Sequence, residues 1–166
     1  KSLPEVYRKN KIPFIFDPGQ EIPLLSGDDL RNGMRGAKAL ISNDYELSLI
    51  MEKTGLNEQE LLTDTELLVT TLGEQGSLIK TRSATYEIPP ARAVAVVDPT
   101  GAGDAYRAGF IKGLLAGWPL ATVGKFAGVV AAYAIEKHGP QSHHVTFKEA
   151  KERYVKNFNE PLPKMC

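Results

Sequence analysis

Short apolar runs recur along the first half of the chain, and a turn or helix-capping residue follows each one. Their length and turn-rich ends predict buried strands rather than helices. The three clearest are Ile12-Pro13-Phe14-Ile15-Phe16, Ala39-Leu40-Ile41-Ser42 and Leu67-Leu68-Val69-Thr70-Thr71. Two further strands are expected at Ser77 to Lys80 and at Tyr86 to Ile88, after a glycine-containing turn.

Capping residues predict helices between and after these strands. The expected helices run from Ser26 to Arg35, from Asn43 to Lys53, from Asn57 to Leu62, from Gly103 to Gly117, from Leu120 to His138, and onward from Thr146-Phe147-Lys148-Glu149. Strands that alternate with helices favour an α/β fold with a mostly parallel sheet flanked by helices. Residues 1–166 are expected to be one domain or a piece of one.

Composition narrows the functional classes. Among the 166 residues, 20 basic side chains balance 20 acidic ones, so nothing in the net charge favours nucleic acid or an anionic membrane as a partner. The single cysteine, Cys166, is the last residue, which excludes an internal disulfide and fits a reducing compartment. The longest apolar stretch, Val123 to Ile135, is too short to span a bilayer and contains Lys125. We therefore expect a cytoplasmic protein without a membrane partner.

The first residues also carry information. The chain opens on Lys1 without an initiator methionine, in a charged segment typical of the end of a helix. No secretory signal is present at this position. We expect that the chain is part of a longer protein whose amino-terminal portion is missing here.

The segment from Asp98 to Phe110 carries the clearest chemistry. A Gly-Ala-Gly turn, Gly101 to Gly103, leads into a helical pattern. Such a turn directs backbone N–H groups toward one point, and the helix dipole adds positive potential there. Glycine also lets a phosphate approach the backbone closely. The pattern therefore predicts an anion-binding loop.

Two familiar phosphate motifs do not fit this loop. A Walker A loop needs a lysine after the turn, and none is present; a dinucleotide fingerprint needs glycine where Tyr106 stands. What remains is an aspartate, Asp104, in the first turn of the helix. An acid repels phosphate, but it is useful if it accepts the proton of an attacking hydroxyl group. The alternative is an ordinary acidic residue at a helix start.

The stretch Asp98-Pro99-Thr100-Gly101-Ala102-Gly103-Asp104-Ala105-Tyr106-Arg107-Ala108-Gly109-Phe110 resembles the second signature of the PfkB, or ribokinase-like, sugar and nucleoside kinases. Its one departure is Pro99, inserted between the acid and the threonine. The resemblance implies that residues 1–166 are the carboxyl-terminal, nucleotide-binding portion of a single ribokinase-like kinase domain, incomplete without its amino-terminal part. It implies phosphoryl transfer from ATP, with Asp104 as the catalytic base. It also implies that the amides of Gly101, Ala102 and Gly103 form an anion hole, and that Asp98 contributes to a site for a monovalent cation such as K⁺.

Two other segments are similar to motifs of the same family. Asn43-Asp44-Tyr45-Glu46 resembles its N-x-x-E motif, in which Asn43 and Glu46 would hold the water shell of Mg²⁺. The alternative is a helix cap in which the acid reaches back to the asparagine. Thr71-Leu72-Gly73-Glu74-Gln75-Gly76 resembles the T-x-G-x-x-G turn, which implies that Thr71, Gly73 and Gly76 lie against the nucleotide. The alternative is an ordinary hairpin turn.

Small residues repeat at four-residue spacing in the two long helices. They are Ala105, Gly109, Gly113 and Gly117 in one helix, and Gly124, Gly128 and Ala132 in the other. Close helix packing is one explanation, because glycine inside a helix otherwise costs about 1 kcal/mol. The family resemblance implies a second explanation, contact with adenine, for which Gly128 is the candidate.

Three other features of the sequence bear on a ligand or metal site. The segment from Ala134 to His143 is similar to the family segment that closes the nucleotide site and donates carbonyl groups to the cation. His138, His143 and His144 lack the cysteines or acidic cluster of a zinc site. Asp17-Pro18-Gly19 either faces the phosphates or is a simple turn.

Taken together, these residues are expected to line one nucleotide site at the carboxyl ends of parallel strands. The resemblance implies an ATP-dependent kinase that acts on a sugar or nucleoside, such as an adenosine- or ribose-like acceptor, and it is compatible with a homodimer. Two alternatives stay open: a module that binds nucleotide without catalysis, and a structural protein without a ligand.

Overall fold

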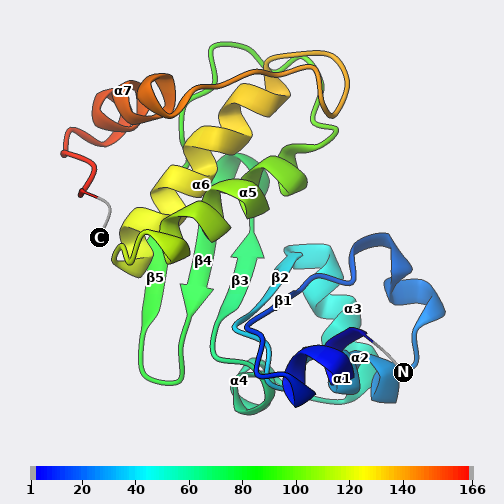
Figure 1. Ribbon diagram of the computed structural model, residues 1–166. Helices are drawn as coiled ribbons and strands as arrows, with labels where there is room; N and C mark the ends of the chain where they lie inside the picture. The colour runs from blue at the N-terminus through cyan, green and yellow to red at the C-terminus, as the bar shows by residue number, and fades with distance from the viewer. Residues whose placement is uncertain (1–2, 165–166) are drawn as a thin grey trace. The chain divides into compact units, whose positions relative to one another are not determined.

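The computed structural model describes residues 3–164, so Cys166 lies outside the described residues. The helices are α1 (Leu3–Lys9), α2 (Gly27–Met34), α3 (Asp44–Thr54), α4 (Glu58–Asp64), α5 (Ala102–Leu115), α6 (Leu120–Ile135) and α7 (Phe147–Phe158) (Figure 1). The strands are β1 (Ile15–Phe16), β2 (Ala39–Asn43), β3 (Leu68–Thr71), β4 (Ser77–Lys80) and β5 (Thr85–Ile88). Two 3₁₀ helices, η1 (Gly19–Leu24) and η2 (Gly73–Gln75), occupy segments that the sequence suggested were turns or irregular.

The five strands form one sheet in the order β1-β2-β3-β4-β5. Strands β1, β2 and β3 are parallel neighbours, and β4 runs in the opposite direction to β3 (Figure 1). The sheet is therefore mixed, and the predicted α/β class with its parallel strands is confirmed.

Strand β1 is shorter than the apolar run predicted. Only Ile15 and Phe16 pair with β2, opposite Ala39 and Leu40. The amide of Ile12 donates instead to the carbonyl of Tyr7, at 2.9 Å, in the turn that ends α1. Pro13 has no N–H to offer a neighbouring strand. Both residues are therefore lost from the expected strand.

The chain divides into two compact units. The first contains the residues up to Gly73 together with 78–86, and the second contains 74–77 together with the residues from Glu87 onward. Buried side chains from η1, β2, β3 and α2 to α4 form the core of the first unit. They are Ile22, Leu30, Met34, Leu40, Leu47, Ile50, Leu61, Leu62 and Leu68.

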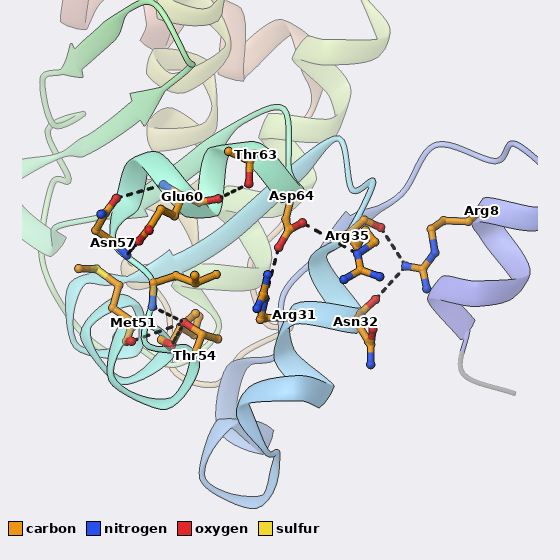
Figure 2. Close-up of polar contacts among 12 residues, drawn as sticks. Arg8, Arg31, Asn32, Arg35, Met51, Thr54, Asn57, Glu60, Thr63 and Asp64 are labelled. Carbon is orange, nitrogen blue, oxygen red and sulfur yellow. Dashed lines mark hydrogen bonds and ion pairs between the residues drawn. The ribbon is translucent and has the colours of Figure 1, made fainter.

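Polar contacts fix the helices of the first unit around this core (Figure 2). The carboxylate of Asp64, at the end of α4, lies 3.7 Å from Arg31 of α2 and 3.9 Å from Arg35, the residue that follows α2. Arg8 of α1 donates to the carbonyl oxygens of Asn32 and Arg35, both at 2.8 Å. These contacts join α1, α2 and α4 through side chains that stay partly in solvent.

In the second unit, helices α5 and α6 pack side by side (Figure 1). A Cβ atom on Gly109 would lie 2.8 Å from the Cα of Ala127, and one on Gly113 would lie 3.1 Å from a methyl group of Val123. Close packing therefore explains these two glycines. It does not explain Gly128, whose Cβ would meet only Ala91, at 3.8 Å.

Helices α6 and α7 hold the segment 91–97, which leads to the Gly-Ala-Gly loop. Arg153 of α7 forms a bidentate ion pair with Glu136, with N–O distances of 2.9 and 3.1 Å, and lies 3.7 Å above the ring of Tyr133. Glu136 also accepts the amide of Val94 at 2.6 Å. A second residue of α7, Asn157, accepts the amide of Arg92 at 2.6 Å. These contacts therefore fix the backbone of segment 91–97, which leads directly to Asp98.

Helix α6 ends at Ile135, three residues earlier than the expected His138. The carbonyl of Ile135 accepts the amides of Val97 at 2.8 Å and Asp98 at 3.1 Å. The amide of Gly139, which would bond that carbonyl in a longer helix, donates to Asp98 at 2.8 Å. Competition from the neighbouring loop therefore ends the helix.

Within residues 3–164, no helix combines the length and the apolar character needed to cross a bilayer.

Replacing Gly109 by alanine should lower the free energy of unfolding by about 1–3 kcal/mol, because the new methyl group meets the backbone of α6. Gly128→Ala is the matched control in the partner helix. There the methyl group has room, so the change should be neutral or stabilising by about 0.4–1 kcal/mol. Chemical denaturation of both variants measures the difference. Equal effects would contradict the packing explanation.

Candidate active site

Four of the predicted residues gather at one edge of the first unit. Asn43 is the last residue of β2 and pairs with Thr71, the last residue of β3. Glu46 lies in the first turn of α3, which begins directly after Asn43. Gly73 follows two residues after Thr71 and begins η2. The carboxyl ends of adjacent parallel strands thus bring Asn43, Glu46, Thr71 and Gly73 into one region, as such sheets do for ligand sites.

Asn43 and Glu46 form a capping box. The Asn43 side chain accepts the amide of Glu46 at 2.7 Å, and the Glu46 carboxylate accepts the amide of Asn43 at 2.9 Å. The capping alternative raised by the sequence is therefore present. Each of these oxygens has a further lone pair, so the cap does not exhaust its capacity as an acceptor.

The two glycines of the T-x-G-x-x-G turn differ in their surroundings. Gly73 has a φ of +58°, and nothing lies within 4 Å of the position a Cβ would take. Gly76 has a φ of +91°, and its Cβ would lie 2.0 Å from the carbonyl of Ile88. The fold of the second unit thus requires glycine at 76, whereas Gly73 borders open space.

In the second unit, the segment 98–101 forms a loop held by Asp98. One oxygen of its carboxylate accepts the amide of Thr100 at 2.9 Å, and the other accepts the amide of Gly139 at 2.8 Å. Hydrogen bonds from the Thr100 side chain, the Gly139 amide and the Thr100 amide lower the pKa of Asp98 to about 2. Asp98 is therefore ionised at neutral pH and ties the loop to the turn after α6.

Gly101 is the N-cap of α5, with φ +84° and ψ −1°. A Cβ there would lie 2.8 Å from both the Cα and the carbonyl oxygen of Pro140. The left-handed conformation and the close backbone each require glycine. The loop can have this shape only because residue 101 carries no side chain.

The first amides of a helix lack the carbonyl partner, four residues earlier, that later amides have. The amide of Ala102 donates to the carbonyl of Pro99 at 3.1 Å, which closes the turn. Of the three amides expected to form the anion hole, that of Ala102 therefore already has a partner. The amides of Gly101 and Gly103 are the stronger candidates, and Ala102 would have to exchange its bond to join them.

Asp104 occupies the third position of α5, and 74% of its side-chain surface is exposed. It forms an ion pair with Arg107, three residues later on the same helix. Two guanidinium nitrogens of Arg107 lie 3.7 and 3.9 Å from the position a Cβ on Gly103 would take. A positive group thus lies beside the loop, which the sequence reasoning missed. The three-residue spacing to Asp104 was the available signal.

A buried hydrogen bond links the glycine turn to the same helix. The hydroxyl groups of Ser77, directly after Gly76, and Tyr106 of α5 are 2.8 Å apart, and both side chains are buried. Burial raises the pKa of Tyr106 to about 12, although the bond to Ser77 acts in the opposite direction. In the sequence, Tyr106 stood out only as part of the signature and as the position where a dinucleotide fingerprint would need glycine. Ser77 is far from it in sequence, so the pairing had no local signal.

The remaining candidates are spread through the two units. Gly128 of α6 faces Ala91 of the loop that leads to Asp98. Asp17 lies between β1 and η1 in the first unit. Across residues 3–164, no group of three or more His, Cys, Asp and Glu side chains is arranged to hold a metal ion. Since the predicted residues belong to two units, the single shared site stays a prediction.

Removing either hydroxyl of the Ser77–Tyr106 pair should leave the other buried without a partner. Ser77→Ala and Tyr106→Phe should each lower the free energy of unfolding by about 1–3 kcal/mol. The double variant should lose clearly less than the sum, because no unpaired hydroxyl remains. Urea denaturation of the four proteins measures the coupling. Strictly additive losses would show that the two groups do not interact.

The chain is similar in sequence and structure to known nucleoside kinases. A nucleoside kinase of Methanocaldococcus jannaschii is 32% identical over 157 residues, which cover 95% of this chain and 51% of that protein. The structure superposes on the nucleoside kinase of Burkholderia thailandensis in complex with ADP-inosine with a TM-score of 0.94. The two are 39% identical, over 98% of this chain and 51% of the other.

The solved nucleoside kinase of M. jannaschii, described as an archaeal member of the ribokinase family, gives a TM-score of 0.85 at 31% identity, over 92% of this chain and 53% of that one. The chain spans about half the length of these relatives. The family model described as "pfkB family carbohydrate kinase" matches residues 2–146. The chain therefore belongs to the pfkB family of carbohydrate kinases.

Proposed function

We propose that the protein transfers the γ-phosphoryl group of ATP to a hydroxyl group of a nucleoside. The observation that carries this proposal is the exposed carboxylate of Asp104, placed in the first helical turn after a glycine loop. A helix start attracts anions, and the same position supplies a base. Family membership supports kinase chemistry over simple anion binding.

In the proposed reaction, the acceptor oxygen attacks the γ-phosphorus. The bond between that phosphorus and the β–γ bridging oxygen breaks, ADP leaves, and the proton of the acceptor hydroxyl passes to Asp104. The amides of Gly101 and Gly103, with the positive end of the α5 dipole, stabilise the charge on the transferred group. Phosphoryl transfer depends mainly on positioning and charge stabilisation, which a fixed loop provides.

We assign the other predicted residues to the nucleotide and its ions. Thr71, Gly73 and Gly76 would lie along the phosphates and ribose, and Gly128 would contact adenine. Gly73 and Gly128 support these roles because neither is crowded by the protein: nothing lies near Gly73, and only Ala91 lies near Gly128. The close carbonyl of Ile88 already explains why residue 76 is glycine. Gly76 would therefore contact the nucleotide through its backbone.

Two ions belong to the proposal. Mg²⁺ lowers the charge of the triphosphate, and the oxygens of Asn43 and Glu46 suit its hydrated shell, since each has acceptor capacity beyond the capping box. K⁺ requires oxygen ligands, and the ionised Asp98 lies against the turn at Gly139 and Pro140, whose carbonyl groups could join it. The donor types present fit both ions.

The acceptor is inferred from relatives. The B. thailandensis nucleoside kinase, 39% identical to this chain, is known in complex with inosine and with ADP-inosine. A nucleoside, rather than free ribose, is therefore the acceptor we propose. Phosphotransfer by the full-length protein to inosine, adenosine and ribose tests this, and a preference for ribose would overturn it.

Asp104→Asn should lower kcat with inosine by roughly 10²-fold or more, because asparagine keeps the shape of the side chain but cannot take the proton. The Kd for ATP should stay equal or fall slightly, since a negative charge near the γ-phosphate is removed. Asp28→Asn, which removes a first-turn acid from α2, is the control and should leave both constants unchanged. Near-normal kcat in Asp104→Asn would exclude Asp104 as the base. Joint loss of stability and ATP binding would support the purely structural alternative.

Asn43→Ala and Asn57→Ala separate capping from metal binding. Each asparagine caps a helix of the first unit through a capping box, so each change should lower the free energy of unfolding by about 1 kcal/mol. Only Asn43→Ala should also raise the KM for Mg·ATP. Thermal unfolding and initial-rate kinetics provide the two readouts. An unchanged KM in Asn43→Ala would show that Asn43 acts only as a cap.

A further inference from the structure

The segment that leads to the glycine loop is held by hydrogen bonds rather than by burial. Residues 91–97 lie directly before Asp98 and belong to no helix or strand. Val94 is 85% exposed and Val96 is 72% exposed, so these side chains gain little from apolar contact. The path of the backbone through this segment therefore depends on the polar groups that bond to it.

One turn, at the end of α6, holds this segment and the start of the loop. Backbone groups of Ile135 and Gly139 bond to residues 97 and 98. Between them lies Glu136, the C-cap residue of α6, whose carboxylate accepts the amide of Val94 at 2.6 Å. Among these contacts from the turn, only that of Glu136 is made by a side chain of the turn. Substitution can therefore remove it and leave the backbone groups of the turn in place.

Arg153 of α7 fixes the Glu136 carboxylate in this position. Its guanidinium group donates to both carboxylate oxygens, at 2.9 and 3.1 Å, and lies 3.7 Å from the centre of the Tyr133 ring. The side chains of Arg153 and Glu136 are 15% and 13% exposed. Such a pair adds little net stability, because desolvation offsets the attraction. It does give the Val94 amide a charged acceptor, which binds more strongly than a neutral one. No net charge is left beside a loop proposed to bind phosphate.

We propose that Glu136 is a positioning residue for phosphoryl transfer, which holds the glycine loop in its active geometry through the amide of Val94. The proposal rests on the phosphoryl-transfer function given above. The amides of Gly101 and Gly103 stabilise the transferred group best if they are fixed before the reaction. A displacement of about 1 Å in such a group can lower the rate by roughly 10²-fold. Glu136 itself contacts neither the nucleotide nor the acceptor.

The alternative is an ion pair that joins α6 to α7 and has no effect on the loop. The two roles depend on different properties of residue 136. Positioning requires an oxygen that reaches the amide of Val94, whereas joining the helices requires the charge that pairs with Arg153. Glutamine keeps the oxygen and loses the charge, and aspartate keeps the charge but is one methylene group shorter. These two substitutions therefore separate the roles.

The experiment uses the full-length protein with ATP and inosine. Two double variants, Glu136→Gln/Arg153→Met and Glu136→Met/Arg153→Met, remove the ion pair without leaving one partner buried and unpaired. They differ only in the oxygen that residue 136 offers to Val94. The kcat and the KM for ATP are measured at a temperature at which thermal unfolding shows every variant folded. Lys125→Met is the matched control, because it removes an ion pair with Glu160, of 2.9 Å, from the other half of α6.

Glu136→Met/Arg153→Met should lower kcat by roughly 10-fold to 10²-fold. The KM for ATP should change less, because misplaced amides weaken the transition state more than the bound substrate. Glu136→Gln/Arg153→Met should retain most of the wild-type kcat, and Lys125→Met should behave like the wild type. In the ligand-free proteins, the amide chemical shifts of Gly101 and Gly103 should change in the first double variant and stay close to wild type in the second.

Glu136→Asp decides the question if Glu136→Met/Arg153→Met does not fold. It retains the charge that pairs with Arg153 but draws the oxygen back from Val94, so its kcat should fall below that of Glu136→Gln/Arg153→Met. The reverse order would overturn the proposal. Equal kcat in the two double variants would overturn it as well.

Failure of the underlying function gives a different pattern. In that case the wild type transfers no phosphate to inosine, or Asp104→Asn has normal kcat. The amide shifts of Gly101 and Gly103 still report whether Glu136 holds the loop, because they are measured without the reaction.

Discussion

The contact between the loop at Asp98–Gly101 and the turn at Ile135–Pro140 is the constraint on which the proposed chemistry depends. The carbonyl of Ile135 accepts the amides of Val97 and Asp98, the amide of Gly139 donates to Asp98, and Pro140 lies against Gly101. Each interaction requires α6 to stop where it does. In turn, the left-handed Gly101 sets the direction in which α5 begins. The exposed position of Asp104 follows from that direction.

Other contacts in the second unit extend this constraint away from the loop. Glu136 and Asn157 hold the incoming segment 91–97 by its amides, and the Ser77–Tyr106 bond fixes α5 to the end of the glycine turn. These partners are buried or half-buried, so they can hold backbone positions that an exposed loop would otherwise lose. Preorganised amides stabilise developing charge without moving during the reaction. The surrounding contacts therefore bear directly on phosphoryl transfer.

Much of the fold could be predicted from local patterns. The apolar runs at Ala39 and Leu67 gave β2 and β3, and capping residues such as Asn43 and Thr146 marked helix starts to within a residue. These signals are local, because a cap or a buried run depends on neighbours in sequence. The predicted start of β1 and the predicted end of α6 were wrong, because backbone groups there bond to other segments. The amide of Ile12 donates to the carbonyl of Tyr7, and the carbonyl of Ile135 accepts the amides of Val97 and Asp98.

In the candidate site, too, local features could be predicted from the sequence and long-range contacts could not. Asp104 and the glycine loop could be found from a contiguous motif, whereas the partners of the loop could not. Nothing near Gly101 predicts that Pro140 lies against it, and nothing near Ser77 predicts Tyr106. The capping box of Asn43 and Glu46 shows a further limit, because the same residues and spacing satisfy both a helix cap and a metal shell.

The central claim is that the amides at the start of α5 bind the nucleotide phosphates. Titration of the ¹⁵N-labelled protein with Mg²⁺ and a non-hydrolysable ATP analogue, followed by amide chemical shifts, tests it directly. The account predicts the largest downfield shifts at the amides of Gly101 and Gly103, with a smaller change at Ala102, whose amide already donates to Pro99. Saturable binding that leaves the Gly101 and Gly103 amides unchanged would contradict the account.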